Sequence, residues 1–257
     1  MFKATPLFSG SSGNCIYVKY GDEEILIDAG VSYKRICTAL NSIGTDISKI
    51  KAVFVTHEHS DHIKALDVLS KHTDAPIYIN SKSAEFFGCD ADELLCGHTI
   101  IANAGESITF NGFEANVFAT PHDSMGSVGY HFTFSDGNRF ALATDMGHLT
   151  EDIKKHLLGC KEVVIESNHD IKMLKNGPYP YNLKQRILSD NGHLSNGACA
   201  DFLPYLVESG TKKIVLAHLS GENNTPSIAY QTSAEALAQA GFTPDDIKLT
   251  VAMKSII

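Results

Sequence analysis

The sequence lacks long apolar runs, and this absence excludes one class of protein. No stretch of its 257 residues approaches the ~18 consecutive apolar residues that a membrane span requires. The first residues, Met1 to Pro6, are not followed by the apolar segment that is typical of a secretory signal. We therefore expect a soluble, cytoplasmic protein with no membrane partner.

Paired cysteines are also absent. The six cysteines are scattered, and no two of them form a Cys-x-x-Cys pair. This spacing fits reduced, packed thiols better than a disulfide framework. A bridge between Cys89 and Cys96 remains open from the sequence alone.

The chain also has no excess of basic residues. The formal net charge is −9, which argues against a protein that wraps nucleic acid through an overall positive field. Bound dications and the local charge distribution can reverse this argument at a particular site. The chain has no low-complexity segment and no clear repeat. With 43% hydrophobic residues it can bury the core of one domain over residues 1–257.

Apolar and alternating patterns predict a mixed α/β protein. Two Asn-Gly or Asp-Gly pairs, at 111–112 and 136–137, lie between strand-like runs and predict hairpins. We expect strands at 14–20, 23–28, 51–55, 108–110, 113–118, 130–134, 139–143, 162–166 and 213–217, and helices at 32–43, 61–71, 195–208 and 227–240. This order predicts an αββα sandwich, in which two mixed sheets are flanked by helices and strand-end loops carry the site.

The segment Thr56-His57-Glu58-His59-Ser60-Asp61-His62 is the strongest chemical signal. It directly follows the apolar run at 51–55 and places three imidazoles and a carboxylate within six positions. His57 and His59 point the same way at period two, while Asp61 and His62 lie over the start of the next predicted helix. Imidazole and carboxylate suit zinc, manganese or another first-row dication, so we expect a site for two adjacent ions.

This motif resembles the signature of the metallo-β-lactamase superfamily, and further matches follow downstream over nearly the whole chain. They are Ile25 to Gly30, Ala119 to His122, Ala143 to Gly147 and Val215 to His218, each at the end of an apolar run. The resemblance implies that one ion is held by His57, His59 and His122, that the second is held by Asp61, His62 and His218, and that Asp145 bridges them. It also implies that Asp28 accepts a hydrogen bond from a ligand imidazole and fixes its tautomer.

Two ions about 3.5–4 Å apart share a hydroxide, lower its pKa and polarise the bond that it attacks, which predicts a hydrolase. No cysteine lies near a ligand motif, in contrast to the β-lactamases of the superfamily. His59 is intact, in contrast to the diiron oxidoreductases. The bridging carboxylate Asp145 favours the phosphodiesterase and thioesterase branches.

Four further segments resemble the YycJ/WalJ (VicX) family, a branch regarded as 5′-to-3′ exonucleases on double-stranded DNA. They are Ser9 to Cys15, Val163 to Asp170, Gly192 to Asn196 and His218 to Asn224. Glu166 and His193 are also similar to the acid-histidine pair of the tRNA 3′-processing nucleases. By this resemblance His193 protonates the leaving oxygen, Glu166 orients and charges His193, and Asp61 doubles as a base. Alternatively, Glu166 caps the next helix and His193 lies in a turn before Ser195 as N-cap.

One basic stretch stands out, because residues 171–188 contain no acid. It carries Lys172, Lys175, Lys184 and Arg186, with two tyrosines between them. Lysine and arginine neutralise phosphates and aromatic rings stack on bases, although a solvated loop before a helix fits equally well. His169 either contacts substrate phosphate or packs against its loop. The turn at Ser11 and Ser12, with Asn14 behind it, either faces an anion or only turns the chain.

The sequence leaves three functions in competition. We expect a two-metal phosphodiesterase on DNA ends. The first alternative is a hydrolase of small phosphodiesters or thioesters, and the second is a non-catalytic, metal-binding partner in a regulatory complex. The choice between zinc and manganese, the cleavage polarity and the oligomeric state are not encoded in these motifs.

Overall fold

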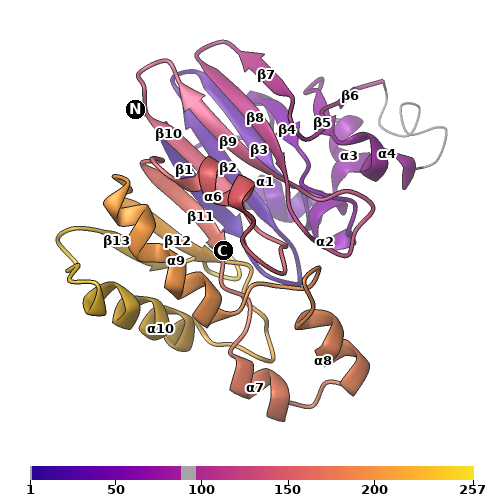
Figure 1. Cartoon of the computed structure of the whole chain (residues 1–257). Helices are drawn as coiled ribbons and strands as arrows, with labels where there is room; N and C mark the ends of the chain where they lie inside the picture. The colour runs from indigo at the N-terminus through magenta and orange to yellow at the C-terminus, as the bar shows by residue number, and fades with distance from the viewer. Residues whose placement is uncertain (1, 88–96) are drawn as a thin grey trace.

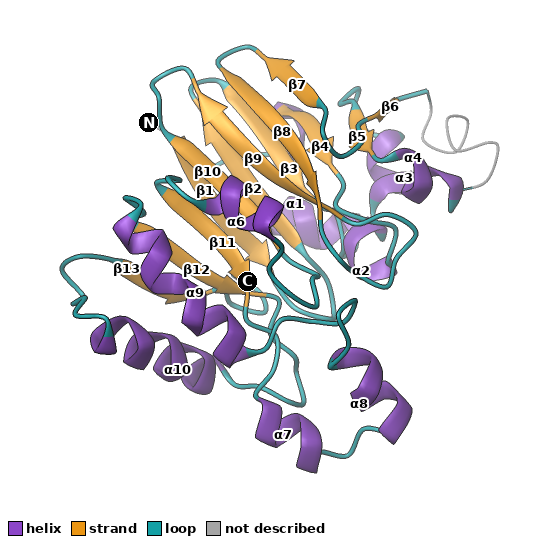
Figure 2. Ribbon diagram, viewed as in Figure 1, coloured by secondary structure: helices purple, strands orange, loops and turns teal. Residues whose placement is uncertain are grey.

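The computed structural model describes residues 2–87 and 97–257, so the open question of a Cys89–Cys96 bridge lies outside the described residues. Two β-sheets stack face to face and helices cover their outer faces (Figures 1 and 2). The predicted αββα architecture is confirmed. None of the described helices combines the length and apolar character needed to cross a bilayer.

The first sheet has six strands in the order β1-β2-β3-β4-β5-β6. β1, β2 and β3 pair antiparallel, whereas β3, β4, β5 and β6 pair parallel. Their bounds are Phe2–Phe8, Cys15–Tyr20, Glu23–Ile27, Ile50–Phe54, Ile77–Ile79 and Thr99–Ile101.

The second sheet has seven strands in the order β13-β12-β11-β10-β9-β8-β7. β7 to β10 form an antiparallel meander, and β10 to β13 are parallel. Their bounds are Ser107–Phe110 (β7), Phe113–Ala119 (β8), Val128–Phe134 (β9), Arg139–Ala143 (β10), Glu162–Glu166 (β11), Lys213–Ala217 (β12) and Lys248–Val251 (β13). Both predicted hairpin turns are present, and Gly112 and Gly137 adopt the positive φ that these turns require.

The central parallel strands are mostly apolar because both of their faces are buried. In β4, Ala52 and Phe54 pack between the sheets, while Val53 packs under the helices of the outer face. In β11, Val164 faces the inter-sheet layer and its neighbours face the other outer layer. Three apolar layers therefore hold the sandwich together and fix the strand ends relative to one another.

The helices divide between the two outer faces. α1 (Tyr33–Ser42) and α3 (Leu66–Ser70) contribute to the core on the first sheet. α6 (Glu151–Leu157), α9 (Asn196–Glu208) and α10 (Pro226–Gln239) contribute to the core on the second. The shorter helical segments are α2 (Ser60–Ile63), α4 (Ser81–Glu85), α7 (Ile171–Asn176), α8 (Tyr181–Ile187) and a 3₁₀ turn at Ile47–Lys49.

The predicted single helix at 61–71 is wrong in one respect, because the segment forms α2 and α3 with a break between them. The backbone of Ala29 causes the break. Its N–H donates to the carbonyl of His62 at 2.7 Å, and its carbonyl accepts from the N–H of Ala65 at 2.8 Å. These two bonds replace helical ones and bind the metal-motif loop to the loop after β3.

Candidate metal centre

The donor side chains meet at one edge of the sandwich, where strands of like direction end. Asp28 follows β3, the histidine motif follows β4, Asp145 follows β10 and His218 follows β12. Among the described residues, the three non-glycine residues with positive φ are Asp28, Asp145 and His218, at 62°, 58° and 55°. Such conformations are uncommon outside glycine and gather at functional sites, and here each one turns a residue of the centre off the end of its strand.

A first donor group consists of three histidines, His57, His59 and His122. His57 Nε2 lies 3.0 Å from His59 Nδ1. His122 comes from the loop after β8 and its Nδ1 donates to the carbonyl of Gly192 at 3.1 Å, which leaves Nε2 for a ligand. The structure thus brings together the three residues that the sequence assigned to one ion.

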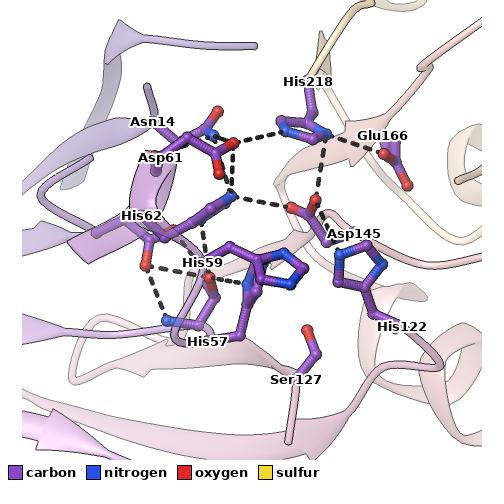
Figure 3. A network of polar contacts seen from close by, with 12 residues as sticks. Asn14, His57, His59, Asp61, His62, His122, Ser127, Asp145, Glu166 and His218 are labelled. Carbon is purple, nitrogen blue, oxygen red and sulfur yellow. Dashed lines mark hydrogen bonds and ion pairs between the residues drawn. The ribbon is translucent and has the colours of Figure 1, made fainter. Parts of the chain in front are cut away.

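A second donor group contains Asp61, His62 and His218. Figure 3 shows their side chains pointing toward one another, Asp61 and His62 from α2 and His218 from the loop after β12. Asp61 Oδ2 lies 3.5 Å from His62 Nε2 and 3.6 Å from His218 Nε2. These are the three residues that the sequence assigned to the second ion.

Asp145 lies between the two groups (Figure 3). Its Oδ2 is 3.5 Å from His62 Nε2, and its Oδ1 is 3.8 Å from His122 Nε2. Asp145 Oδ1 also lies 3.3 Å from His218 Nδ1, so this carboxylate is close to members of both donor groups.

The second group fits a divalent cation by its spacing and by its unpaired atoms. Ligands about 2.0–2.2 Å from a tetrahedral ion lie about 3.3–3.6 Å from one another. The separations of Asp61, His62 and Asp145 donor atoms fall in this range. His218 Nε2 and Asp145 Oδ2 are buried and have no hydrogen-bond partner, and buried polar atoms are rarely left unpaired. A cation at this position supplies the missing partner to both atoms.

Asp28 and Thr56 fix the orientation of His62 and His57 by contacting the Nδ1 atoms of their rings. Asp28 Oδ2 accepts a 2.7 Å hydrogen bond from His62 Nδ1, so His62 presents Nε2 to the centre. Asp28 also accepts from the Thr56 backbone N–H and hydroxyl. The Thr56 oxygen lies 3.1 Å from His57 Nδ1 and can accept from it. The predicted contact of Asp28 with a donor imidazole is present, and Thr56 extends it to a second histidine.

Glu166 is fully buried at the end of β11 and contacts two histidines. Its Oε1 lies 2.7 Å from His193 Nδ1 and 3.0 Å from His218 Nδ1, and its Oε2 accepts from the backbone N–H groups of Met146 and Leu194. His193 is 3.8 Å from Asp145 and lines the adjoining pocket. Glu166 and His193 therefore pair as the sequence predicts, and Ser195 caps α9 at the same time.

The carboxylates make the centre attractive to positive charge. Burial alone lowers the pKa of His62, but Asp28 and Asp145 outweigh it and raise this pKa to about 10. Burial likewise opposes protonation of His218, and Asp145 together with Asp61 raises its pKa well above the usual value. By contrast, burial and then the neighbouring imidazoles of His62 and His122 lower the pKa of His57, which keeps it neutral. A cation can replace the protons on His62 and His218.

The basic segment forms α7 and α8, which project beyond the sandwich on the side of the centre (Figure 1). Lys172 and Lys175 are exposed on α7. Lys184 donates to the carbonyl of Lys175 at 2.8 Å, and Arg186 forms an ion pair with Asp123. Of the four predicted phosphate contacts, only Lys172 and Lys175 therefore present unengaged ammonium groups in the described contacts.

The other predicted substrate contacts differ in position. Ser11 and Ser12 are exposed, and Ser11 lines the pocket beside His193 and His218. Asn14 instead lies within the centre, where its Nδ2 is 3.0 Å from His62 Nε2. His169 is only 1% exposed, and both of its ring nitrogens lack a partner among the described residues. Its place is thus inside the loop rather than on the pocket wall.

Several functional neighbours were missed by sequence reasoning. Ser9 Oγ accepts from the His218 N–H at 2.8 Å, and Asn168 Nδ2 donates to the His218 carbonyl at 2.8 Å. These bonds hold the positive-φ backbone of His218. Asp123, directly after His122, was missed too. The sequence did offer one signal for these three polar residues, because each lies within or directly beside one of the motifs described above.

Comparisons with known proteins agree with this geometry. The sequence pattern of the metallo-beta-lactamase superfamily matches residues 9–218. The chain is 36% identical over 236 residues to Exodeoxyribonuclease YycJ of Bacillus anthracis, covering 92% of this chain and 89% of that protein. It is also 36% identical over 245 residues to Exodeoxyribonuclease WalJ of Streptococcus pneumoniae serotype 2 (strain D39 / NCTC 7466), covering 93% and 89%.

Among solved structures, the metallo-beta-lactamase fold protein YhfI from Bacillus subtilis superimposes with a TM-score of 0.74 at 17% identity, over 99% of this chain and 98% of that one. This likeness shows the shared fold. The match over residues 9–218 and the two relatives at 36% identity establish that the chain belongs to the metallo-β-lactamase superfamily, in its YycJ/WalJ branch.

Proposed function

We propose that this chain is a binuclear metal-dependent phosphodiesterase that degrades double-stranded DNA from its ends in the 5′-to-3′ direction. The observation that carries the proposal is the pairing of Glu166 with His193 directly beside a complete set of seven metal donors. Two relatives at 36% identity over most of the chain bear the name exodeoxyribonuclease, which supports DNA as the substrate.

The donors divide between two ions. His57, His59 and His122 would hold one, and Asp61, His62 and His218 would hold the other, with Asp145 shared. When bound, two divalent ions, zinc or manganese, supply an activated water and neutralise charge on the phosphate under attack.

Side chains of the protein are then responsible for proton transfer. Glu166 engages Nδ1 of His193, so that Nε2 is the ring atom left to deliver a proton to the leaving oxygen. Burial alone lowers the pKa of His193, but the Glu166 carboxylate outweighs it and raises this pKa, which favours the protonated acid. Burial raises the pKa of Asp61, but His218 and His62 outweigh it and lower this pKa, so Asp61 remains an ionised carboxylate.

Binding of metal should stabilise the fold. At a free Zn²⁺ or Mn²⁺ concentration 100-fold above Kd, one ion adds about 2.7 kcal/mol to the free energy of unfolding. For a chain of this size this raises Tm by about 5–10 °C relative to the protein in chelator. Thermal unfolding with and without metal measures the shift. His218→Ala, which removes one donor of the second group, should show a smaller shift, and an equal shift would contradict this donor assignment.

Lys172 and Lys175 should strengthen binding to DNA by contacting phosphates. For a duplex substrate, log Kd plotted against log salt has a slope set by the number of phosphate contacts. Replacing both lysines by alanine should reduce the magnitude of this slope by about 2. The control is Lys3→Ala with Lys51→Ala. It removes two exposed charges near the starts of β1 and β4, at the ends of these strands that lie away from the metal centre. Equal slopes for both double variants would show that α7 does not contact DNA.

The salt dependence also tests a second candidate, a hydrolase of small phosphodiesters or thioesters. A pocket of about 170 Å³ beside the centre and the net charge of −9 favour this alternative. Cleavage of a small neutral substrate should hardly respond to salt, whereas duplex cleavage should fall steeply. Efficient, salt-insensitive turnover of a small ester with no DNA cleavage would favour the second candidate.

A further inference from the structure

Helix α8 stands apart from the core, although it borders the metal centre. None of its seven residues is buried, and Tyr181 at its start is 77% exposed. Figure 2 shows it outside the two stacked sheets. The contacts that hold it are polar: the Ile187 carbonyl accepts from the backbone N–H of His193 at 3.0 Å, and Lys184 binds the carbonyl of Lys175. A helix attached in this way has a role other than core packing.

The inner side of α8 forms one wall of the pocket at the centre. Leu183, Arg186 and Ile187 of this helix, with the preceding Tyr179, face the pocket. His193 and His218 lie on the side of the metal donors, and Ser11 and Ser220 also line the pocket. The cavity volume of about 170 Å³ is well below the ~300–1,000 Å³ typical of sites for drug-sized ligands.

An ion pair links α8 to the loop after β8 at this pocket. Arg186 Nε of α8 donates to Asp123 Oδ2, and both residues line the pocket. Asp123 directly follows His122, and its Oδ1 lies 3.4 Å from His122 Nε2. The pair therefore joins α8 to the loop that carries a donor of the first group.

We propose that α8 and the Arg186–Asp123 pair form an end stop that lets only a strand terminus reach the metal centre. This inference rests on the proposed nuclease function and explains why cleavage starts from DNA ends. An endonuclease needs a groove that is open on both sides of the scissile phosphate. In this proposal Tyr179, Leu183 and the ion pair, which line the pocket, stand on the second side, so Arg186 acts on specificity rather than as a phosphate contact.

The test compares two duplexes of identical sequence, one with open ends and one with both ends closed by hairpin loops. Wild type should degrade the open duplex and leave the closed one intact. Arg186→Glu places a carboxylate against Asp123 and should raise the ratio of closed-duplex to open-duplex cleavage by about two- to five-fold or more. The ratio corrects for any general loss of activity or of DNA binding.

Two further variants separate the ion pair from other effects. The charge exchange Arg186→Asp with Asp123→Arg keeps the net charge and restores the pair, so it should return the ratio toward the wild-type value. Tyr179→Ala with Leu183→Ala widens the pocket without a change in charge and should raise the ratio.

The outcomes distinguish the end stop from the nuclease itself. Ratios that stay at the wild-type value in Arg186→Glu and in Tyr179→Ala with Leu183→Ala would overturn the end stop. Cleavage of the closed duplex by wild type as fast as the open one would overturn it as well, while leaving the nuclease assignment in place. If wild type cleaves neither duplex, the proposed function fails and the end stop fails with it.

Discussion

Asp61→Ala should lower the rate of duplex DNA degradation by about 10³-fold or more. Asp61 Oδ2 lies 3.5 Å from His62 Nε2 and 3.6 Å from His218 Nε2, so its removal takes away the carboxylate that completes the second donor group. A loss of about 4 kcal/mol of transition-state stabilisation, in the range supplied by a catalytic metal, corresponds to about 10³-fold in rate. Initial rates with saturating Mn²⁺, together with metal content per chain, measure the effect.

The matched control is Asp22→Ala. Asp22 is exposed in the turn after β2, at the end of that strand away from Asn14 and the centre. Its replacement should leave both the rate and the metal content unchanged. Full activity of metal-purified Asp61→Ala would show that the observed degradation comes from another nuclease in the preparation.

His193→Ala should lower the rate by about 10²–10⁴-fold without loss of metal, because the residue acts as an acid rather than as a donor. Its Nδ1 is engaged by Glu166 at 2.7 Å. The loss should depend on the leaving group. Duplex DNA needs a proton on the leaving oxygen, whereas thymidine 5′-(p-nitrophenyl phosphate) releases a stable anion and should be cleaved by the variant at nearly the wild-type rate. Equal losses on both substrates would rule out a general acid at His193.

Glu166→Gln provides a companion measurement through the pH profile. The Glu166 carboxylate raises the pKa of His193, so the protonated acid persists to higher pH in the wild type. Removal of this charge lowers that pKa, and activity should then be lost at a lower pH on the alkaline side. An unchanged profile would mean that Glu166 has only a structural role.

The resemblance to the metallo-β-lactamase superfamily implied the donor set, and the apolar run before each motif placed the motifs at strand ends. Parallel strands in a buried sheet are apolar on both faces, and a polar residue at their end is easily seen, as with Asp145 after β10 and His218 after β12. The hairpins at Gly112 and Gly137 were equally clear, since positive φ demands such residues. These local rules located the strand ends, and the fold brought them to one edge.

Contacts between distant loops could not be predicted in the same way. The break between α2 and α3 depends on hydrogen bonds to Ala29, more than 30 residues earlier in the chain, which no local pattern encodes. The Arg186–Asp123 pair likewise joins α8 to the loop after β8. It engages the guanidinium of Arg186, which the sequence suggested as a phosphate contact. Asn14 was predicted as a substrate contact but lies beside His62. This contact also joins distant parts of the chain, so no local pattern encodes it.

The most direct measurement of the central claim uses a linear duplex carrying one label at the 5′ end of a strand and a different label at the 3′ end of the other. Wild-type protein, with two Mn²⁺ ions per chain verified on the same sample, should release the 5′ label at once as a mononucleotide and shorten the 3′-labelled strand step by step. Asp61→Ala should release neither label. An intact duplex in the presence of protein that holds both ions would contradict the account and direct the search to a small-molecule substrate.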